Sequence, residues 1–312
     1  MKAANRRLGN GIALTARMIL GAIFIVSAVA KIVGIDSFEI YIFSYNLLPL
    51  NCAMLAARLI IVAERLTGLG LTVNVWRRFV NSCTILLLTV FTLFLCYAAL
   101  MGRTDSCQCM GSLVELNPLQ SLLKNAVLAL LLVVAMRARP WNWRPKWYVW
   151  LPVVVTVCVV PFILSAPDNW LFGPAEELYN APKLEEAMGE QGVLHELDLD
   201  EGRHVVAFLS PGCQFCRMTD EKLTYICRRN DLDSTAVVYL APTADTTISL
   251  PSLDTTAFIH PCYLISNLDF VQITYGQRPM VFLMENGRVK ATCHYRNIDE
   301  RQITTFLHHE EK

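Results

Sequence analysis

Five long apolar stretches in the first 166 residues limit the possible folds more than any other feature of this sequence. They cover residues 12–35, 51–75, 79–101, 117–136 and 147–166. A helix of about 20 mostly apolar residues crosses the hydrocarbon core of a bilayer and satisfies its own backbone hydrogen bonds there. We therefore expect a multi-pass α-helical membrane bundle of four helices, with a fifth helix that tethers the rest of the chain.

Charge separates the two halves of the chain. Residues 1–166 carry 15 Lys and Arg against 5 Asp and Glu, whereas residues 167–312 carry 12 against 22. The formal net charge of zero therefore conceals +10 in the first half and −10 in the second. With 54% hydrophobic and 17% charged residues, the sequence is not that of a soluble single domain, a disordered chain or a basic nucleic-acid binder.

Basic residues in the short loops predict the orientation in the membrane. They precede the first stretch and lie between the second and third and between the fourth and fifth. Of the alternate loops, residues 36–50 have no basic residue and residues 102–116 have only Arg103. Because positive loops stay in the cytoplasm, we expect an inner-membrane protein with a cytoplasmic N-terminus and a periplasmic C-terminal domain.

The first stretch also has the appearance of a cleaved signal peptide. Basic residues precede it, and Ala28-Val29-Ala30 imitates a cleavage site. The apolar run before this triplet is long for a signal peptide, and it continues beyond the triplet. We therefore expect the segment to remain as a helix.

The pattern changes after Pro167 to that of a small α/β domain. Prolines and acidic residues over 167–195 indicate a tether that ends in a short lead-in segment. Buried-strand runs, helical spacing and an Asn-Gly hairpin turn predict the elements that follow. The expected strands cover residues 204–210, 235–240, 280–284 and 288–292, and the expected helices cover residues 213–229 and 299–309.

A Cys-x-x-Cys motif, Cys213 to Cys216, follows the first of these strands and begins the helix. The spacing allows a disulfide, and a helix N-terminus favours the thiolate form of the first cysteine. A lone Cys-x-x-Cys can also be half of a zinc site, but no second such pair or close Cys/His pair completes one in this sequence. We therefore predict a redox-active pair and no metal site.

The strand, the Cys-x-x-Cys helix and the hairpin after Pro279 resemble a thioredoxin-like domain of the MauD or TlpA type over residues 193–310. The resemblance implies that Pro279 is a cis-proline facing the cysteine pair. Arg278 would then lie near Cys213 and stabilise its thiolate, and an exposed arginine pointing away is the alternative. Gln-Phe replaces the Gly-Pro of thioredoxin between the cysteines. Because this dipeptide tunes the redox potential, the resemblance does not give the direction of electron flow.

A second close pair, Cys107-Gln108-Cys109, lies in the loop between the third and fourth stretches. The expected orientation places this loop on the same side of the membrane as the Cys-x-x-Cys motif. A disulfide across one intervening residue closes a small strained ring, and strained exposed disulfides are the labile, oxidising ones. Two free or structural thiols are the alternative.

The membrane half resembles the DoxX-like four-helix proteins and, among them, the MauE group of methylamine-utilisation proteins. The matching segments are Arg17-Met18-Ile19-Leu20-Gly21, Tyr45-Asn46-Leu47-Leu48-Pro49 and Asp105-Ser106-Cys107-Gln108-Cys109-Met110-Gly111. The resemblance implies that a thioredoxin-like partner, separate in that group, is fused here. We expect a membrane domain over 1–137, the fifth helix and tether over 138–192, and the thioredoxin-like domain over 193–312.

Ionisable residues inside membrane stretches are functional candidates because they are costly in lipid. We expect Glu64 to pair with a basic group such as Lys31 or an arginine of its own helix, and the functional interpretation of these residues is a quinone-headgroup pocket or a proton path beside Cys107 and Cys109. Snorkelling by Lys31 and structural pairing of the others are the alternative.

Five further cysteines leave their pairing open: Cys52, Cys96, Cys227, Cys262 and Cys293. Cys52 and Cys96 are candidates for a second relay pair near the outer membrane face. A disulfide such as Cys262–Cys293 is compatible with an oxidising compartment.

Together these features predict a membrane thiol–disulfide oxidoreductase. Cys213, resolved by Cys216, would exchange with the thiols or disulfides of an extracytoplasmic client protein and then with Cys107 and Cys109. We favour oxidation of client thiols with a membrane quinone as acceptor. The reverse direction, which carries electrons from the cytoplasm to the client, would need a dithiol near the cytoplasmic face of the membrane, and Cys83 is a single cysteine there. A reductant relay and a non-catalytic assembly factor are the alternatives. The client, the terminal acceptor and the oligomeric state stay open.

Overall fold

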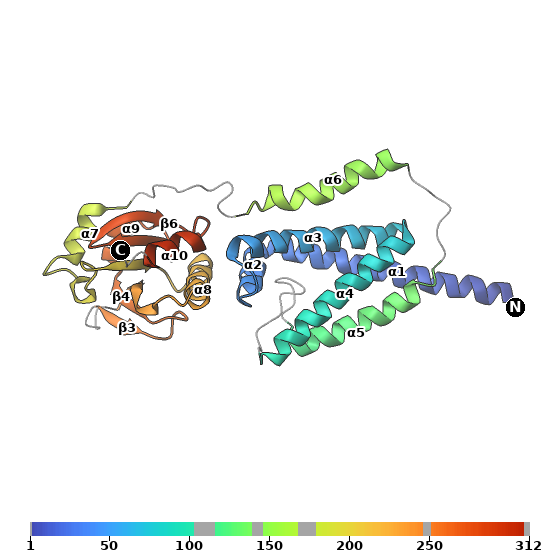
Figure 1. Cartoon of the computed structure of the whole chain (residues 1–312), viewed down its shortest axis with the longest axis horizontal. Coiled ribbons are helices and arrows are strands. Elements are labelled where there is room, and N and C mark those ends of the chain that lie inside the picture. The colour runs from blue at the N-terminus through green and yellow to red at the C-terminus, as the bar shows by residue number, and fades with distance from the viewer. Residues whose placement is uncertain (1, 103–115, 139–145, 168–178, 246–250, 309–312) are drawn as a thin grey trace. The chain divides into compact units, whose positions relative to one another are not determined.

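A computed structural model of the chain describes residues 2–102, 116–138, 146–167, 179–245 and 251–308. The chain divides into two compact units. The first comprises residues 1–41 and 54–166, and the second comprises residues 42–53 and 167–312. The sequence before Pro167 is helical in its described parts, and a mixed sheet with helices follows it (Figure 1). The chain is therefore a helical membrane bundle followed by an α/β domain.

Of the six helices described before Pro167, all but the second correspond to the predicted spans. They are α1 (Lys2–Val33), α2 (Ile35–Phe43), α3 (Leu50–Val73), α4 (Arg77–Leu100), α5 (Pro118–Ala135) and α6 (Trp147–Leu164). By length and composition, three helical segments of the described chain can cross a membrane: Gly9–Val33, α4 and α5. The apolar part of α6, Tyr148–Leu164, is shorter, and α3 carries Arg58, Glu64 and Arg65.

The helix α2 corrects the prediction of a loop over residues 36–50. Phe38, Ile40 and Phe43 are buried on this helix. At 100° per residue these positions do not share one helical face, and nine residues are too few to have been recognised as a membrane stretch. The helix also buries Glu39, which a loop exposed to water would not do.

Two glycines let α1 and α3 approach each other closely. A Cβ on Gly21 would lie 2.8 Å from the Gly68 carbonyl oxygen, and a Cβ on Gly68 would lie 2.9 Å from the Gly21 carbonyl oxygen. Small residues at such crossings allow backbone contact between membrane helices. Beside the crossing, apolar side chains of α1, α3, α4 and α5 form one cluster: Leu20, Phe24, Leu71, Val80, Leu88, Leu128 and Leu132.

The second unit contains a six-stranded sheet with the order β3-β4-β2-β1-β5-β6. Its strands are β1 (Arg203–Phe208), β2 (Val237–Thr243), β3 (Ser252–Asp254), β4 (Cys262–Ser266), β5 (Met280–Glu285) and β6 (Arg288–Cys293). Strand β2 runs parallel to both β1 and β4, and β5 is antiparallel to both β1 and β6. Four helices accompany the sheet: α7 (Ala181–Met188), α8 (Gln214–Arg229), α9 (Asn267–Thr274) and α10 (Glu300–His308).

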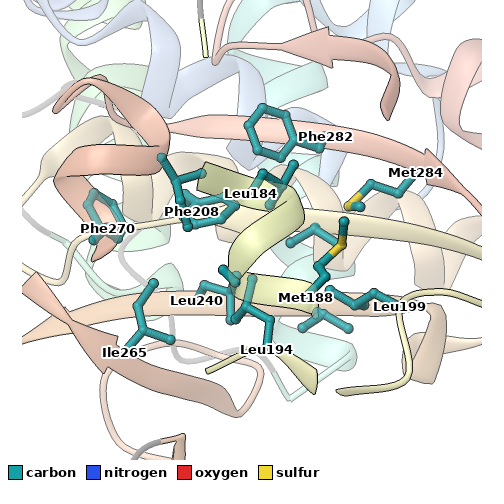
Figure 2. Close-up of a cluster of buried hydrophobic side chains, with 14 of the residues drawn as sticks. Leu184, Met188, Leu194, Leu199, Phe208, Leu240, Ile265, Phe270, Phe282 and Met284 are labelled. Atoms are coloured by element: carbon teal, nitrogen blue, oxygen red, sulfur yellow. The ribbon is translucent and has the colours of Figure 1, made fainter. Parts of the chain in front are cut away.

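One face of the sheet carries the main apolar core (Figure 2). Phe208, Leu240 and Phe282 project from three neighbouring strands, and Leu184 of α7 and Phe270 of α9 pack onto them. Each large side chain buried in this way contributes about 1.5–3 kcal/mol. Since α7 lies within this core, the compact part of the domain begins before residue 193.

The predicted strands and the two predicted helices of this domain are present, with bounds that differ by a few residues. The turn between β5 and β6 has positive φ at Asn286 (50°) and Gly287 (74°), the backbone conformation that makes Asn-Gly favourable in a tight hairpin. The sequence did not predict β3, β4 or α9. Their apolar runs are too short to be distinguished from loops.

Candidate functional site

The Cys-x-x-Cys motif lies at the carboxyl end of a central strand. After β1, the Leu209 N–H continues the ladder by donating to the Leu240 carbonyl, and the Cys213 N–H closes a turn by donating to the Ser210 carbonyl (3.0 Å). Cys213 is the N-cap residue of α8, and Cys216 lies in its first turn. Both are free thiols in this structure.

The two sulfurs have different environments. Cys213 is partly exposed, whereas Cys216 is fully buried. Burial raises the pKa of the Cys216 thiol to about 12. The neighbouring Cys213 sulfur adds to this increase, while a backbone hydrogen bond from Ser210 and the Arg278 guanidinium oppose it. Cys216 is therefore a neutral thiol at physiological pH, and Cys213 is the sulfur of the pair that a partner can reach.

Pro279 and Arg278 lie beside this turn. The Arg278–Pro279 peptide bond is cis, the form that the thioredoxin-like resemblance implies. Met280 pairs with Phe208 at the end of β1, so the residue before Met280 lies next to the segment that leads to Cys213. The Arg278 Nη1 donates to the Ser210 Oγ at 3.4 Å, which places its positive charge at the turn preceding the cysteine pair.

A groove of about 470 Å³ adjoins the cysteine pair. It is lined by Phe215, Gly276, Gln277, Arg278, Pro279, His294, Tyr295 and Arg296. Phe215, between the two cysteines, is 44% exposed, and its ring centroid lies 5.3 Å from that of Tyr295. The sequence does not reveal this groove, because residues 294–296 are about 80 positions from the Gln-Phe dipeptide in the chain.

A buried lysine supports the far wall of the groove. The Lys222 Nζ donates to the Tyr295 carbonyl oxygen at 3.1 Å and lies 3.8 Å from the centroid of the Tyr295 ring. Lys222 is fully buried, so its ammonium depends on these contacts for stabilisation. The lysine therefore holds Tyr295, and with it Phe215, in place.

Among the membrane helices, Lys31 of α1 and Glu64 of α3 form a buried ion pair. The Lys31 Nζ lies 2.9 Å from the Glu64 Oε1 and donates to the Ser27 Oγ at 2.7 Å. The same ammonium lies 5.6 Å from the Phe38 ring centroid and 5.8 Å from that of Phe91. Lys31, rather than an arginine of α3, is thus the partner of Glu64.

A second buried ion pair was missed by the sequence analysis. The Arg58 Nη1 lies 2.5 Å from the Glu39 Oε1 and also donates to the Met54 carbonyl, while the Arg58 Nε donates to the Ser165 carbonyl. This pair ties α2, α3 and the end of α6 together within the membrane unit. Glu39 was overlooked because residues 36–50 had been interpreted as a loop.

Cys107 and Cys109 lie outside the described residues. Among the other candidates, Cys52 of α3 and Cys96 of α4 are exposed free thiols. Within the described ranges, no group of three or more His, Cys, Asp or Glu side chains is placed to hold a metal ion.

The candidate disulfide Cys262–Cys293 is wrong. Both residues are buried free thiols, Cys262 on β4 and Cys293 on β6. Strands β2, β1 and β5 lie between them, which at about 4.8 Å per strand amounts to about 19 Å. A disulfide requires Cα atoms less than about 7 Å apart.

Comparison with known proteins agrees with this architecture. Residues 10–138 match the family described as methylamine utilisation protein MauE. The chain is also similar to Protein TlpB of Flavobacterium psychrophilum, with 27% identity over an alignment of 266 residues that covers 69% of this chain and 72% of TlpB. No solved structure matches the chain. The match over residues 10–138 and the similarity to TlpB indicate a membrane-associated role in thiol–disulfide redox chemistry or in assembly.

Proposed function

We propose that this chain is a membrane-anchored thiol–disulfide oxidoreductase that oxidises the thiols of extracytoplasmic client proteins. The observation that carries the proposal is the unequal pair at the start of α8, with a reachable Cys213 and a buried, protonated Cys216 beside Pro279. An exchange reaction needs these two functions: one sulfur that forms a mixed disulfide with the partner and a second that resolves it.

The proposed client reaction begins with the Cys213–Cys216 disulfide. A client thiolate attacks the Cys213 sulfur, breaks its bond to Cys216 and forms a mixed disulfide, and Cys216 leaves and takes up a proton. A second client thiolate then attacks the client sulfur and releases Cys213. The client gains a disulfide and loses two electrons, which reside on the Cys213–Cys216 dithiol. This dithiol is reoxidised by exchange with a Cys107–Cys109 disulfide, which becomes a dithiol in turn.

A membrane quinone is the proposed acceptor beyond Cys107 and Cys109, and it supplies two-electron acceptor chemistry. The donor set at Lys31 and Glu64 fits such a headgroup in chemistry, since an ammonium and a carboxylate lie together and the ammonium lies 5.6 Å from the Phe38 ring centroid and 5.8 Å from that of Phe91. Lys31 would orient a carbonyl oxygen by hydrogen bonding, and Glu64 with Ser27 would hold a proton nearby. No covalently bound cofactor is part of this proposal.

Trapping of the redox states tests the relay. In cells expressing the full chain, we expect Cys107→Ser to leave Cys213 and Cys216 reduced, as read by acid quenching, alkylation and mass spectrometry. Cys83→Ser is the matched control, since Cys83 lies in α4 and has no part in the proposal. If Cys213 and Cys216 stay fully oxidised in Cys107→Ser, the relay is refuted. If the pair is instead mostly reduced in the unmodified chain and becomes oxidised in Cys107→Ser, the reductant direction is favoured.

A non-catalytic assembly factor is the second candidate, and the aromatic groove favours it, because exposed Phe215 and the neighbouring Tyr295 could bind a client without electron transfer. This function predicts that the Cys213–Cys216 pair is inert toward dithiothreitol and glutathione, whereas the oxidoreductase equilibrates with both.

The proposed orientation has a cytoplasmic N-terminus and places everything after residue 166 outside the cytoplasm. Alkaline phosphatase fused after residue 312 should be active, and a fluorescent protein that matures only in the cytoplasm should stay dark at the same position. An inactive phosphatase fusion and a bright fluorescent-protein fusion would place the domain in the cytoplasm, where it could not meet an extracytoplasmic client, and would refute the proposed orientation.

A further inference from the structure

The groove beside the cysteine pair is basic, although the domain that contains it is acidic. Arg278, Arg296 and His294 are among its eight lining residues, and no Asp or Glu is. Residues 167–312 as a whole carry 12 Lys and Arg against 22 Asp and Glu. The positive charge at this site is therefore a local departure from the domain's composition.

The basic side chains lie where the neighbours of a reacting cysteine would pass. Arg278 reaches Ser210, three residues before Cys213, and Phe215 is exposed between Cys213 and Cys216. A client polypeptide that brings its sulfur to Cys213 therefore brings its adjoining residues to the exposed Phe215 and to the groove that Arg278 and Arg296 line. The two guanidinium groups match carboxylates in charge and in hydrogen-bonding geometry.

We propose that this groove selects client polypeptides that carry Asp or Glu within about two residues of the reacting cysteine. The inference rests on the proposed function, because it concerns the client of the same site. A partly exposed pair of this kind contributes modestly, so two arginines give an expected preference of about threefold to tenfold for an acidic client over a neutral one. The preference diminishes as salt screens the charges.

The test uses the full chain in detergent, reduced, with synthetic disulfide peptides as probes. Three peptides differ only beside the reactive cysteine, where they carry Asp, Asn or Lys. The readout is the initial rate at which the Cys213 thiol is lost to a mixed disulfide, by acid quenching, alkylation and mass spectrometry. In this step the Cys213 thiolate attacks the peptide disulfide, and one peptide sulfur leaves and takes up a proton.

We expect the rates to fall in the order Asp, Asn, Lys, and to converge at high salt. Arg296→Gln should lower the Asp-to-Asn ratio without abolishing it, because Arg278 remains, and Arg296→Lys should restore part of the loss. Arg288→Gln is the matched control, because Arg288 is an exposed arginine of β6 that does not line the groove.

Two outcomes overturn the inference: equal rates for the three peptides with the unmodified chain, or an equal loss of preference in Arg288→Gln and Arg296→Gln. Failure of the proposed function has a different signature, because Cys213 would then exchange with none of the peptides. Differences between the three peptides and between the two arginine variants thus test client selection, whereas a complete lack of exchange at Cys213 tests the proposed function.

Discussion

The unequal burial of the Cys213 and Cys216 sulfurs predicts how much more slowly Cys216 reacts than an ordinary thiol. Only the thiolate is alkylated. With a pKa raised from 9.0 to about 12, about one Cys216 in 10⁴ is ionised at pH 8, against about one in ten for an unperturbed thiol. Ionisation alone therefore slows alkylation of Cys216 about 10³-fold, and burial of the sulfur adds to this.

The assay uses two single-cysteine variants of the pair, Cys213→Ser and Cys216→Ser, in the full chain. Each is treated with iodoacetamide over pH 6 to 10, and the Cys213–Cys216 peptide is quantified by mass spectrometry. In Cys213→Ser, the rate at Cys216 should rise about tenfold per pH unit until the pH nears its pKa, which burial still raises although the contribution of the Cys213 sulfur is lost. Cys227, whose pKa burial raises to about 11, is the internal reference, and urea-unfolded protein is the control. A rate for Cys216 that equals its unfolded rate at pH 8 would refute the reasoning.

Two further predictions concern buried groups. Glu64→Gln should lower the thermal stability of the full chain in detergent, since removal of one partner of a buried ion pair costs about 3–5 kcal/mol. The double variant Lys31→Met/Glu64→Leu should recover most of it, and a double variant as unstable as Glu64→Gln would contradict a buried charge as the cause. Peptide mapping after air oxidation should reveal no peptide linking Cys262 to Cys293, and such a link would contradict the observed strand order.

The sequence predicted the features that depend on local pattern. Cys213 and Cys216 follow a strand and begin a helix, and the Asn286-Gly287 turn forms the hairpin, because each signal lies within a few consecutive residues. Helical membrane stretches were recognised for the same reason, since their backbone hydrogen bonds join residues four positions apart.

The features that were missed depend on which distant segments meet. The order of the six strands places three strands between Cys262 and Cys293, and nothing in the spacing of the two cysteines reveals this. The groove was missed likewise, because Phe215 of α8 meets Tyr295, which follows β6. Glu39 was missed because it lies on a helix of only nine residues. Its ion-pair partner, Arg58, belongs to the next helix along the chain.

In the proposed exchange, the Arg278 side chain would connect the choice of client to the second step. Its positive charge lowers the pKa of Cys216, against the larger effect of burial. A client carboxylate that pairs with Arg278 neutralises part of this charge, so Cys216 holds its proton more tightly and attacks the mixed disulfide more slowly. With the reduced chain and disulfide peptides, an Asp-flanked peptide should therefore form the mixed disulfide faster than its Asn-flanked counterpart and also accumulate it to a higher level. Arg278→Gln should abolish the difference in the rate at which the mixed disulfide is resolved, because the charge that the carboxylate would neutralise is then absent. Equal accumulation with both peptides in the unmodified chain would show that Arg278 does not connect the two steps.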